Sequence, residues 1–235
     1  MLPQFLYICP LILSAVSALP TDCTEVCTAQ SCPLEDFGTC AGTTGVAGPE
    51  SLTTRNGLKY TGFARYSTPL NVPSLIGVTP ASIPNIAVHG VGAPSAYVQP
   101  MTISPDPASG KMTFNFEKFS WAAVLDTAQG VAGVPLGSIV TVRGQVPGEA
   151  QKRTQTLVYD PASPTLKEVV TLTYKRPMKD VDFGNKFHGV ESVEFVDFRA
   201  APVTGFLDLL LNKIGVTKRD VVPVALLMDN LGFSF

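Results

Sequence analysis

The cysteines are the residues of this chain whose chemistry follows most directly from their spacing. Four of them lie close together near the amino terminus, at Cys23, Cys27, Cys32 and Cys40. An even number of closely spaced cysteines in an oxidising compartment is typical of structural disulfides. A zinc site is the alternative, and the absence of a CxxC pair disfavours it. We therefore expect two bridges within this segment, and the sequence does not choose among the three pairings.

The residues before these cysteines predict the oxidising compartment. Residues 1–18 contain an apolar run that ends in the small residues of the sequence SAVSA, which is the pattern of a secretory signal peptide. The fifth cysteine, Cys9, lies within it. No later apolar stretch reaches the roughly 18 residues that a membrane span needs. We expect a secreted, extracellular protein with no membrane span.

A second candidate for chemistry is Asp229, a carboxylate in an apolar strand near the carboxyl terminus. If side chains alternate strictly, it shares a face with Leu227, Leu231 and Phe233, which predicts its burial. A buried carboxylate is costly unless it is paired or hydrogen-bonded. A structural Ca²⁺ would satisfy it, and so would backbone amides at a bulge or a neighbouring arginine. The sequence leaves these solutions open.

Residues suited to catalysis are sparse. The chain has two histidines, His89 and His188, and neither a Gly-x-Ser-x-Gly nor a His-Glu-x-x-His motif. Glu191, Glu194 and Asp197 crowd one predicted strand, whereas a glycosidase needs two carboxylates that face each other across a sugar. The net charge of −2 disfavours a nucleic-acid partner. We predict a protein that is not an enzyme and does not bind nucleic acid.

The elements that must position these residues are short strands. Gly and Pro each occur 20 times, and β-rich runs recur between turn signals. The predicted strands cover residues 58–63, 86–98, 112–125, 138–144, 154–159, 169–174, 190–198 and 226–235. This pattern predicts an all-β fold, an antiparallel β-sandwich or jelly roll. Apolar residues at helical spacing over 206–214 predict one short inserted helix.

Three regions follow from this pass along the chain. Residues 1–18 are the signal peptide, residues 19–48 a disulfide-stapled segment and linker, and residues 49–235 the jelly-roll domain. Four aromatic residues within the domain, Tyr60, Tyr66, Tyr97 and Trp121, are candidates for stacking on sugar rings. Trp121 lies in a phenylalanine-rich run, so the core is the alternative place for its side chain.

An ordered series of motifs resembles a family of small secreted fungal proteins. The segments are NGLKYTGF at 56–63, NIAVHGVGAPS at 85–95, FNFEKFSWAA at 114–123, VPLGSIVTVRG at 134–144, FHGVESVEF at 187–195 and LMDNL at 227–231. The resemblance implies a galactose-binding-like jelly roll, as found in non-catalytic carbohydrate-binding modules. It also implies a polysaccharide or cell-wall partner. The predicted helix at 206–214 departs from the family pattern.

The same resemblance bears on the carboxylate site. By its position in the family pattern, Glu50 is implied as the second ligand of a Ca²⁺ at Asp229, and no other cofactor is expected. A structural or host-interaction protein of effector type, with no sugar ligand, is the alternative function. Exposed aromatic residues along a groove would favour the glycan-binding function over this alternative.

Overall fold

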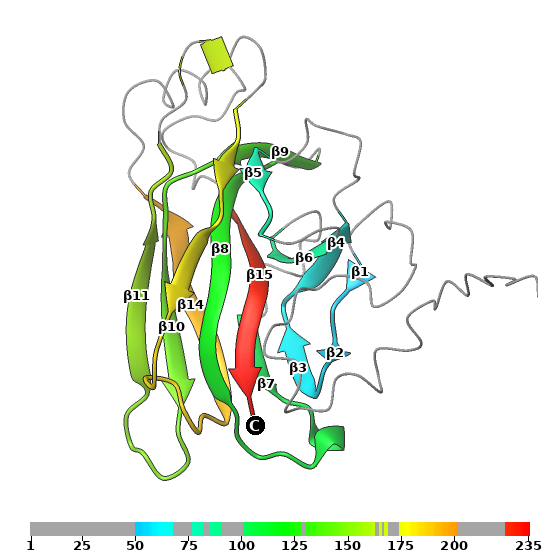
Figure 1. Ribbon diagram of the computed structural model, residues 1–235, viewed down its shortest axis with the longest axis vertical. Helices are drawn as coiled ribbons and strands as arrows, with labels where there is room; N and C mark the ends of the chain where they lie inside the picture. The colour runs from blue at the N-terminus through cyan, green and yellow to red at the C-terminus, as the bar shows by residue number, and fades with distance from the viewer. Residues whose placement is uncertain are drawn as a thin grey trace, which may run out of the picture.

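The computed structural model describes residues 50–67, 77–81, 85–90, 101–127, 130–162, 165, 167–168, 174–201 and 224–235. These residues form an antiparallel β-sandwich, which confirms the predicted fold class (Figure 1). The predicted signal peptide, the cysteine segment and the helix at 206–214 lie outside the described residues. Within the described ranges, no helix is long and apolar enough to cross a membrane.

The first layer is a seven-stranded sheet that contains both ends of the described chain. Its order is β1-β4-β6-β15-β8-β13, and β9 pairs with β8 beside this path. The bounds are β1 Glu50–Ser51, β4 Ala64–Ser67, β6 Asn85–His89, β15 Val224–Ser234, β8 Asn115–Thr127, β13 Lys179–Asp182 and β9 Gly130–Pro135. The long strands β8 and β15 therefore lie side by side at its centre.

The second layer is a six-stranded sheet of order β11-β10-β14-β7-β3-β2. The bounds are β11 Arg153–Tyr159, β10 Ser138–Gln145, β14 Ser192–Ala200, β7 Met101–Pro105, β3 Leu58–Thr61 and β2 Thr54–Arg55. A two-residue loop of Asn56 and Gly57 joins β2 to β3, and both residues have positive φ, as a tight hairpin of this length requires. Two short strands, β5 Val78–Thr79 and β12 Arg176–Pro177, form a separate parallel pair.

Aromatic side chains from the two sheets meet in the core. Phe116 and Phe119 of β8 lie with their ring centroids 6.2 and 5.7 Å from that of Phe195 on β14. Trp121 is 0% exposed, and its ring lies 5.7 Å from that of Tyr159 on β11. Phe116, Phe119 and Trp121 of β8 therefore belong to the core.

Strand β15 departs from the strict alternation on which the sequence prediction relied. Its register against β8 shifts between Asp229 and Gly232, which marks a β-bulge. Asn230, inside the shift, has a φ of 48°. Asparagine enters this left-handed region more readily than most residues, because its short polar side chain can bond locally.

The bulge places Asp229 and Phe233 on opposite faces of the sheet, contrary to the prediction. Phe233 pairs with the core residue Phe116. Asp229 pairs with Ser120, which follows the core residue Phe119 and so points away from the second sheet. The prediction of one shared face is therefore wrong beyond the bulge, because the bulge adds a residue that alternation does not count. The predicted burial of Asp229 is confirmed, since its exposed fraction is 0%.

Candidate functional site

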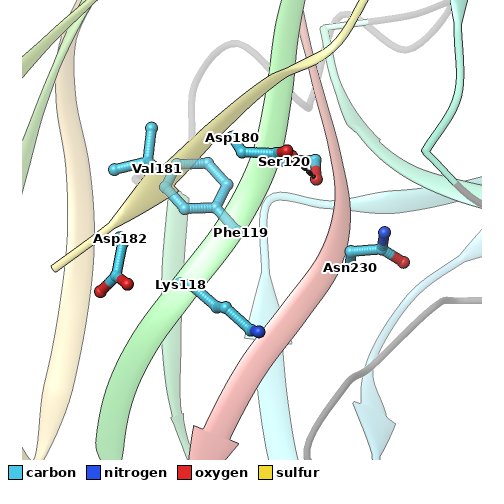
Figure 2. A pocket seen from close by; sticks show the side chains of 7 residues that line it. All are labelled: Lys118, Phe119, Ser120, Asp180, Val181, Asp182 and Asn230. Atoms are coloured by element: carbon cyan, nitrogen blue, oxygen red, sulfur yellow. Dashed lines mark hydrogen bonds between the residues drawn. The ribbon is translucent and has the colours of Figure 1, made fainter. Parts of the chain in front are cut away.

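A pocket opens on the outer face of the seven-stranded sheet, where β8 lies between β13 and β15 (Figure 2). Its volume is about 370 Å³. Seven residues from these three strands line it: Lys118, Phe119, Ser120, Asp180, Val181, Asp182 and Asn230. We call it the β8 pocket. None of these residues was predicted from the sequence to belong to a site.

Two bulges on paired strands shape the β8 pocket. The bulge of β15 contains Asn230, as described above. Strand β8 has its own irregularity: Phe116 and Phe119 both lie in the core although they are three residues apart, and the register shifts again between Gly232 and Phe233. The extra residue leaves Lys118 exposed on the outer face. Bulges commonly re-aim side chains next to functional sites.

A row of polar residues crosses the three strands at the inner end of the pocket. Ser120 pairs in register with Asp180 of β13 on one side and with Asp229 of β15 on the other. The Ser120 hydroxyl donates a hydrogen bond of 2.5 Å to Oδ1 of Asp180. Oδ1 of Asp229 accepts the backbone amide of Asn230 at 2.8 Å. The buried Asp229 thus stabilises the bulge that presents Asn230.

The next row holds the groups with free bonding capacity. Lys118 pairs in register with Asp182, and Figure 2 shows it between Asp182 and Asn230. Oδ1 of Asp182 accepts the amide of Gly184 at 2.8 Å. Within the described part of the chain, neither Lys118 nor Asp182 forms an ion pair, and the side-chain amide of Asn230 makes no hydrogen bond. These groups are available to a ligand.

The chemistry of the pocket is that of polar recognition. An ammonium and an amide supply donors, and two carboxylates and the amide oxygen supply acceptors. The hydroxyl of Ser120 donates to the carboxylate of Asp180. The lining therefore suits binding of a ligand rich in hydroxyl groups.

The two histidines lie elsewhere. His89 is buried on β6, where its Nδ1 donates to the carbonyl of Gly62 at 2.7 Å and its ring contacts that of Phe63. Burial lowers the pKa of His89, and the bond to the Gly62 carbonyl opposes this shift. His188 donates its backbone amide to the carbonyl of Asn185. Neither histidine lines the β8 pocket.

The predicted metal ligands lie on the same sheet but not on neighbouring strands. Glu50 is in β1 and Asp229 in β15, with β4 and β6 between them. Among the described residues, no group of three or more His, Cys, Asp or Glu side chains gathers as a metal site. A Ca²⁺ shared by Glu50 and Asp229 stays a prediction. The bridges among Cys23, Cys27, Cys32 and Cys40 also stay predictions, because these residues lie outside the described ranges.

None of the aromatic candidates for sugar stacking that the structure describes is fully exposed. Trp121 and Tyr60 are buried, and Tyr66 is half-buried against the core. Tyr97 lies outside the described residues. The large apolar side chains that are exposed in the described part of the chain are Met112 and Val158, neither of them aromatic.

The carboxylates near β14 are surface charges, and two of the three have basic partners. Glu194 accepts the ammonium of Lys152 at 2.7 Å, and Asp197 accepts Arg143 at 3.3 Å. Glu191 is exposed. These pairs lie on or beside the six-stranded sheet and do not contribute to the β8 pocket.

A second polar cluster joins the loop after β11 to β12. Arg176 forms a two-pronged ion pair with Glu168, at 3.0 and 3.3 Å, and its guanidinium lies 4.4 Å from the centre of the Tyr174 ring. Hydrogen bonds from Arg176 and then from Thr165 lower the pKa of Glu168 to about 2. Because these groups satisfy one another, the cluster leaves little capacity for a ligand.

Comparison with known proteins assigns no family. No family model and no curated protein matches the chain. A solved structure of a DUF4465 family protein from Bacteroides caccae is similar in shape, with a TM-score of 0.40 and 9% sequence identity. The match covers 75% of this chain and 78% of that chain. This likeness is too weak to support a functional argument.

Proposed function

We propose that this chain is a secreted, non-catalytic β-sandwich protein that binds an extracellular glycan or cell-wall polymer in the β8 pocket. The observation that carries the proposal is the uncommitted polar lining: Lys118, Asp182 and Asn230 line a hollow and bind no other side chain of the described structure. The volume of about 370 Å³ lies in the range of small-ligand pockets. The ordered motifs resemble a family of small secreted fungal proteins, and the galactose-binding-like jelly roll that this resemblance implies supports the same class of ligand.

The lining suits a sugar in particular because a sugar offers a hydroxyl on nearly every carbon. Each hydroxyl both donates and accepts, so it can bridge an ammonium or amide donor and a carboxylate acceptor. Lys118 and Asp182 pair in register on adjacent strands and supply such a donor and acceptor. The hydrogen bonds formed by charged groups are the stronger ones.

Polysaccharide retention tests this function. The secreted protein would be incubated with insoluble chitin, β-glucan and cellulose, and the bound fraction measured. We expect retention on one of these polymers, weakened about tenfold by Lys118→Met or Asp182→Ala, since each removes a charge-assisted hydrogen bond. Lys59→Met is the matched control, because Lys59 is exposed on β3 of the other sheet. Wild-type protein that no polysaccharide retains would overturn the proposal.

A second candidate function is a structural or host-interaction protein with no sugar ligand. The specific observation in its favour is that Trp121 and Tyr60, candidates for sugar stacking, are buried. Glycan sites generally use an aromatic face, so a site without one must rely on hydrogen bonds alone. Failure of every polysaccharide in the retention test would favour this second function.

A further inference from the structure

The outer face of β8 has two different halves, and the β8 pocket lies at the boundary between them. Beyond Ser120, the next outward residues are Ala122 and Val124, and both are 0% exposed. Their partners on β15, Leu227 and Ala225, are buried as well. The outer face of the sheet is therefore covered in this direction, and a ligand in the pocket cannot extend along it.

The opposite direction along β8 is open and polar. Lys118 is exposed, and Glu117 and Asn115 are partly exposed on the same face. From Ser120 to Asn115 the strand extends about 16 Å, which is longer than a single sugar ring. A ligand longer than the pocket can extend only along this half of the strand.

Side chains in the open half are already held in place by one another. Ser234 donates its hydroxyl to Oε1 of Glu117 at 2.8 Å, and it accepts Nδ2 of Asn115 at 3.0 Å. Oδ1 of Asn115 accepts the amide of Gly189 at 2.9 Å. This order leaves Oε2 of Glu117 and the second amide hydrogen of Asn115 as fixed bonding groups. Groups ordered before binding lose little conformational entropy when a ligand arrives.

We propose that the β8 pocket binds the end of a glycan chain. The terminal sugar lies against Ser120 and Asp180, and the sugars that follow extend along Glu117 toward Ser234 and Asn115. The inference rests on the proposed glycan-binding function and makes it more specific. A site that binds the interior of a glycan chain must be open at both ends. The β8 pocket is closed at one end, where the outer face at Ala122 is covered.

Labelled oligosaccharides test which part of a chain is bound. Oligomers of one to six sugars, prepared from the polymer that retains the protein, would be titrated with an uncapped end, with a bulky label at the reducing end, or with one at the non-reducing end. We expect the affinity to rise up to about three sugars and then level off. We also expect a label at one end to abolish binding and a label at the other end to leave it unchanged.

Two outcomes separate this inference from the function on which it rests. Binding that tolerates a label at either end, or that keeps rising to six sugars, would overturn the chain-end inference and leave glycan binding in place. Absence of binding to every oligomer and polymer would overturn both.

Variants in the open half give an independent readout. Glu117→Gln and Ser234→Ala remove groups that only the second and third sugars reach, so we expect them to weaken trisaccharide binding about three- to tenfold. Neither should change binding of the monosaccharide. Glu191→Gln removes an exposed carboxylate elsewhere and is the matched control. Equal losses for the monosaccharide and the trisaccharide would contradict the assignment of the open half to later sugars. The melting temperature of each variant reports whether it is folded.

Discussion

The outer faces of the two sheets carry charged residues of the same kinds but use them differently. On the six-stranded sheet, Glu194 is paired with Lys152 and Asp197 with Arg143. On the seven-stranded sheet, the charges of the β8 pocket have no ion-pair partner among the described residues. Because paired charges satisfy one another, those on the outer face of the six-stranded sheet have little capacity left for a ligand. The charges of the β8 pocket on the seven-stranded sheet remain available to one.

A bulge alone does not explain this difference. The six-stranded sheet also has an irregularity, between Ile139 and Thr141, where Asp197 has a φ of 53°. There the displaced Asp197 meets Arg143 on the neighbouring strand. In the β8 pocket the bulges of β8 and β15 lie opposite each other and expose Lys118 and Asn230 without such partners. The candidate site is therefore distinguished by the absence of ion pairs among its described charged residues, rather than by backbone irregularity.

The largest expected effect comes from removing the carboxylate that supports the bulge. Asp229→Ala removes a fully buried side chain and leaves the backbone amide of Asn230 without its acceptor, so we expect a loss of about 2–4 kcal/mol in the free energy of unfolding. Urea denaturation measures it. A loss below about 0.5 kcal/mol would show that the carboxylate does not stabilise the bulge.

Thermal melting of the wild-type protein tests the predicted ion. An ion bound only by the folded state raises the melting temperature with its concentration. A melting temperature that rises with calcium, falls with EDTA and loses both responses in Asp229→Asn would support a Ca²⁺ shared with Glu50. An unchanged melting temperature would leave the hydrogen-bonded carboxylate as the explanation.

Two variants of Asn230 separate its backbone from its side chain. Asn230→Ala places a residue with a Cβ at a φ of 48° without a polar side chain, so we expect a loss of about 1 kcal/mol in stability. Asn230→Gly accepts this φ and should keep most of the stability. Both variants lack the amide that lines the pocket, so both should bind glycan less well. If the stable Asn230→Gly protein binds glycan as well as wild type does, the side chain of Asn230 does not contribute to the site.

Acid should destabilise the seven-stranded sheet through His89. Because burial lowers the pKa of this histidine in the folded state, the unfolded state binds the proton more readily. Stability should therefore be unaffected above the ordinary pKa of about 6.5 and fall as the pH drops below it. His89→Gln should lose this part of the pH dependence, and His188→Gln controls for loss of a histidine elsewhere. Equal slopes of stability against pH in wild type and His89→Gln would refute the assignment.

The smallest effect is expected on the paired face. Glu194→Gln breaks a partly exposed ion pair with Lys152, and such pairs contribute at most about 1 kcal/mol. Thermal melts at low and high salt measure the loss, which should shrink as salt screens the charges. Glycan binding should not change. A loss of glycan binding in Glu194→Gln would show that the outer face of the six-stranded sheet also contributes to binding.

The pattern of residues along the chain predicted the class of fold and most of its central strands. Alternating residues in 138–144 and 154–159 predicted β10 and β11 closely, because a strand half-buried in a sandwich needs an apolar residue at every second position. The phenylalanines of β8 were likewise readable as core. The burial of Asp229 also followed from its apolar neighbours.

The place of the candidate site depends on how the strands are arranged in the sheet, which the residue pattern does not give. Lys118, Asp180 and Asn230 are far apart in sequence and meet because β13, β8 and β15 are neighbours in one sheet. The direction in which Asp229 points depended on a bulge, and a bulge is fixed by how two strands pair rather than by either strand alone. Whether a carboxylate or a lysine forms an ion pair cannot be predicted from its own strand, since its partner comes from another strand.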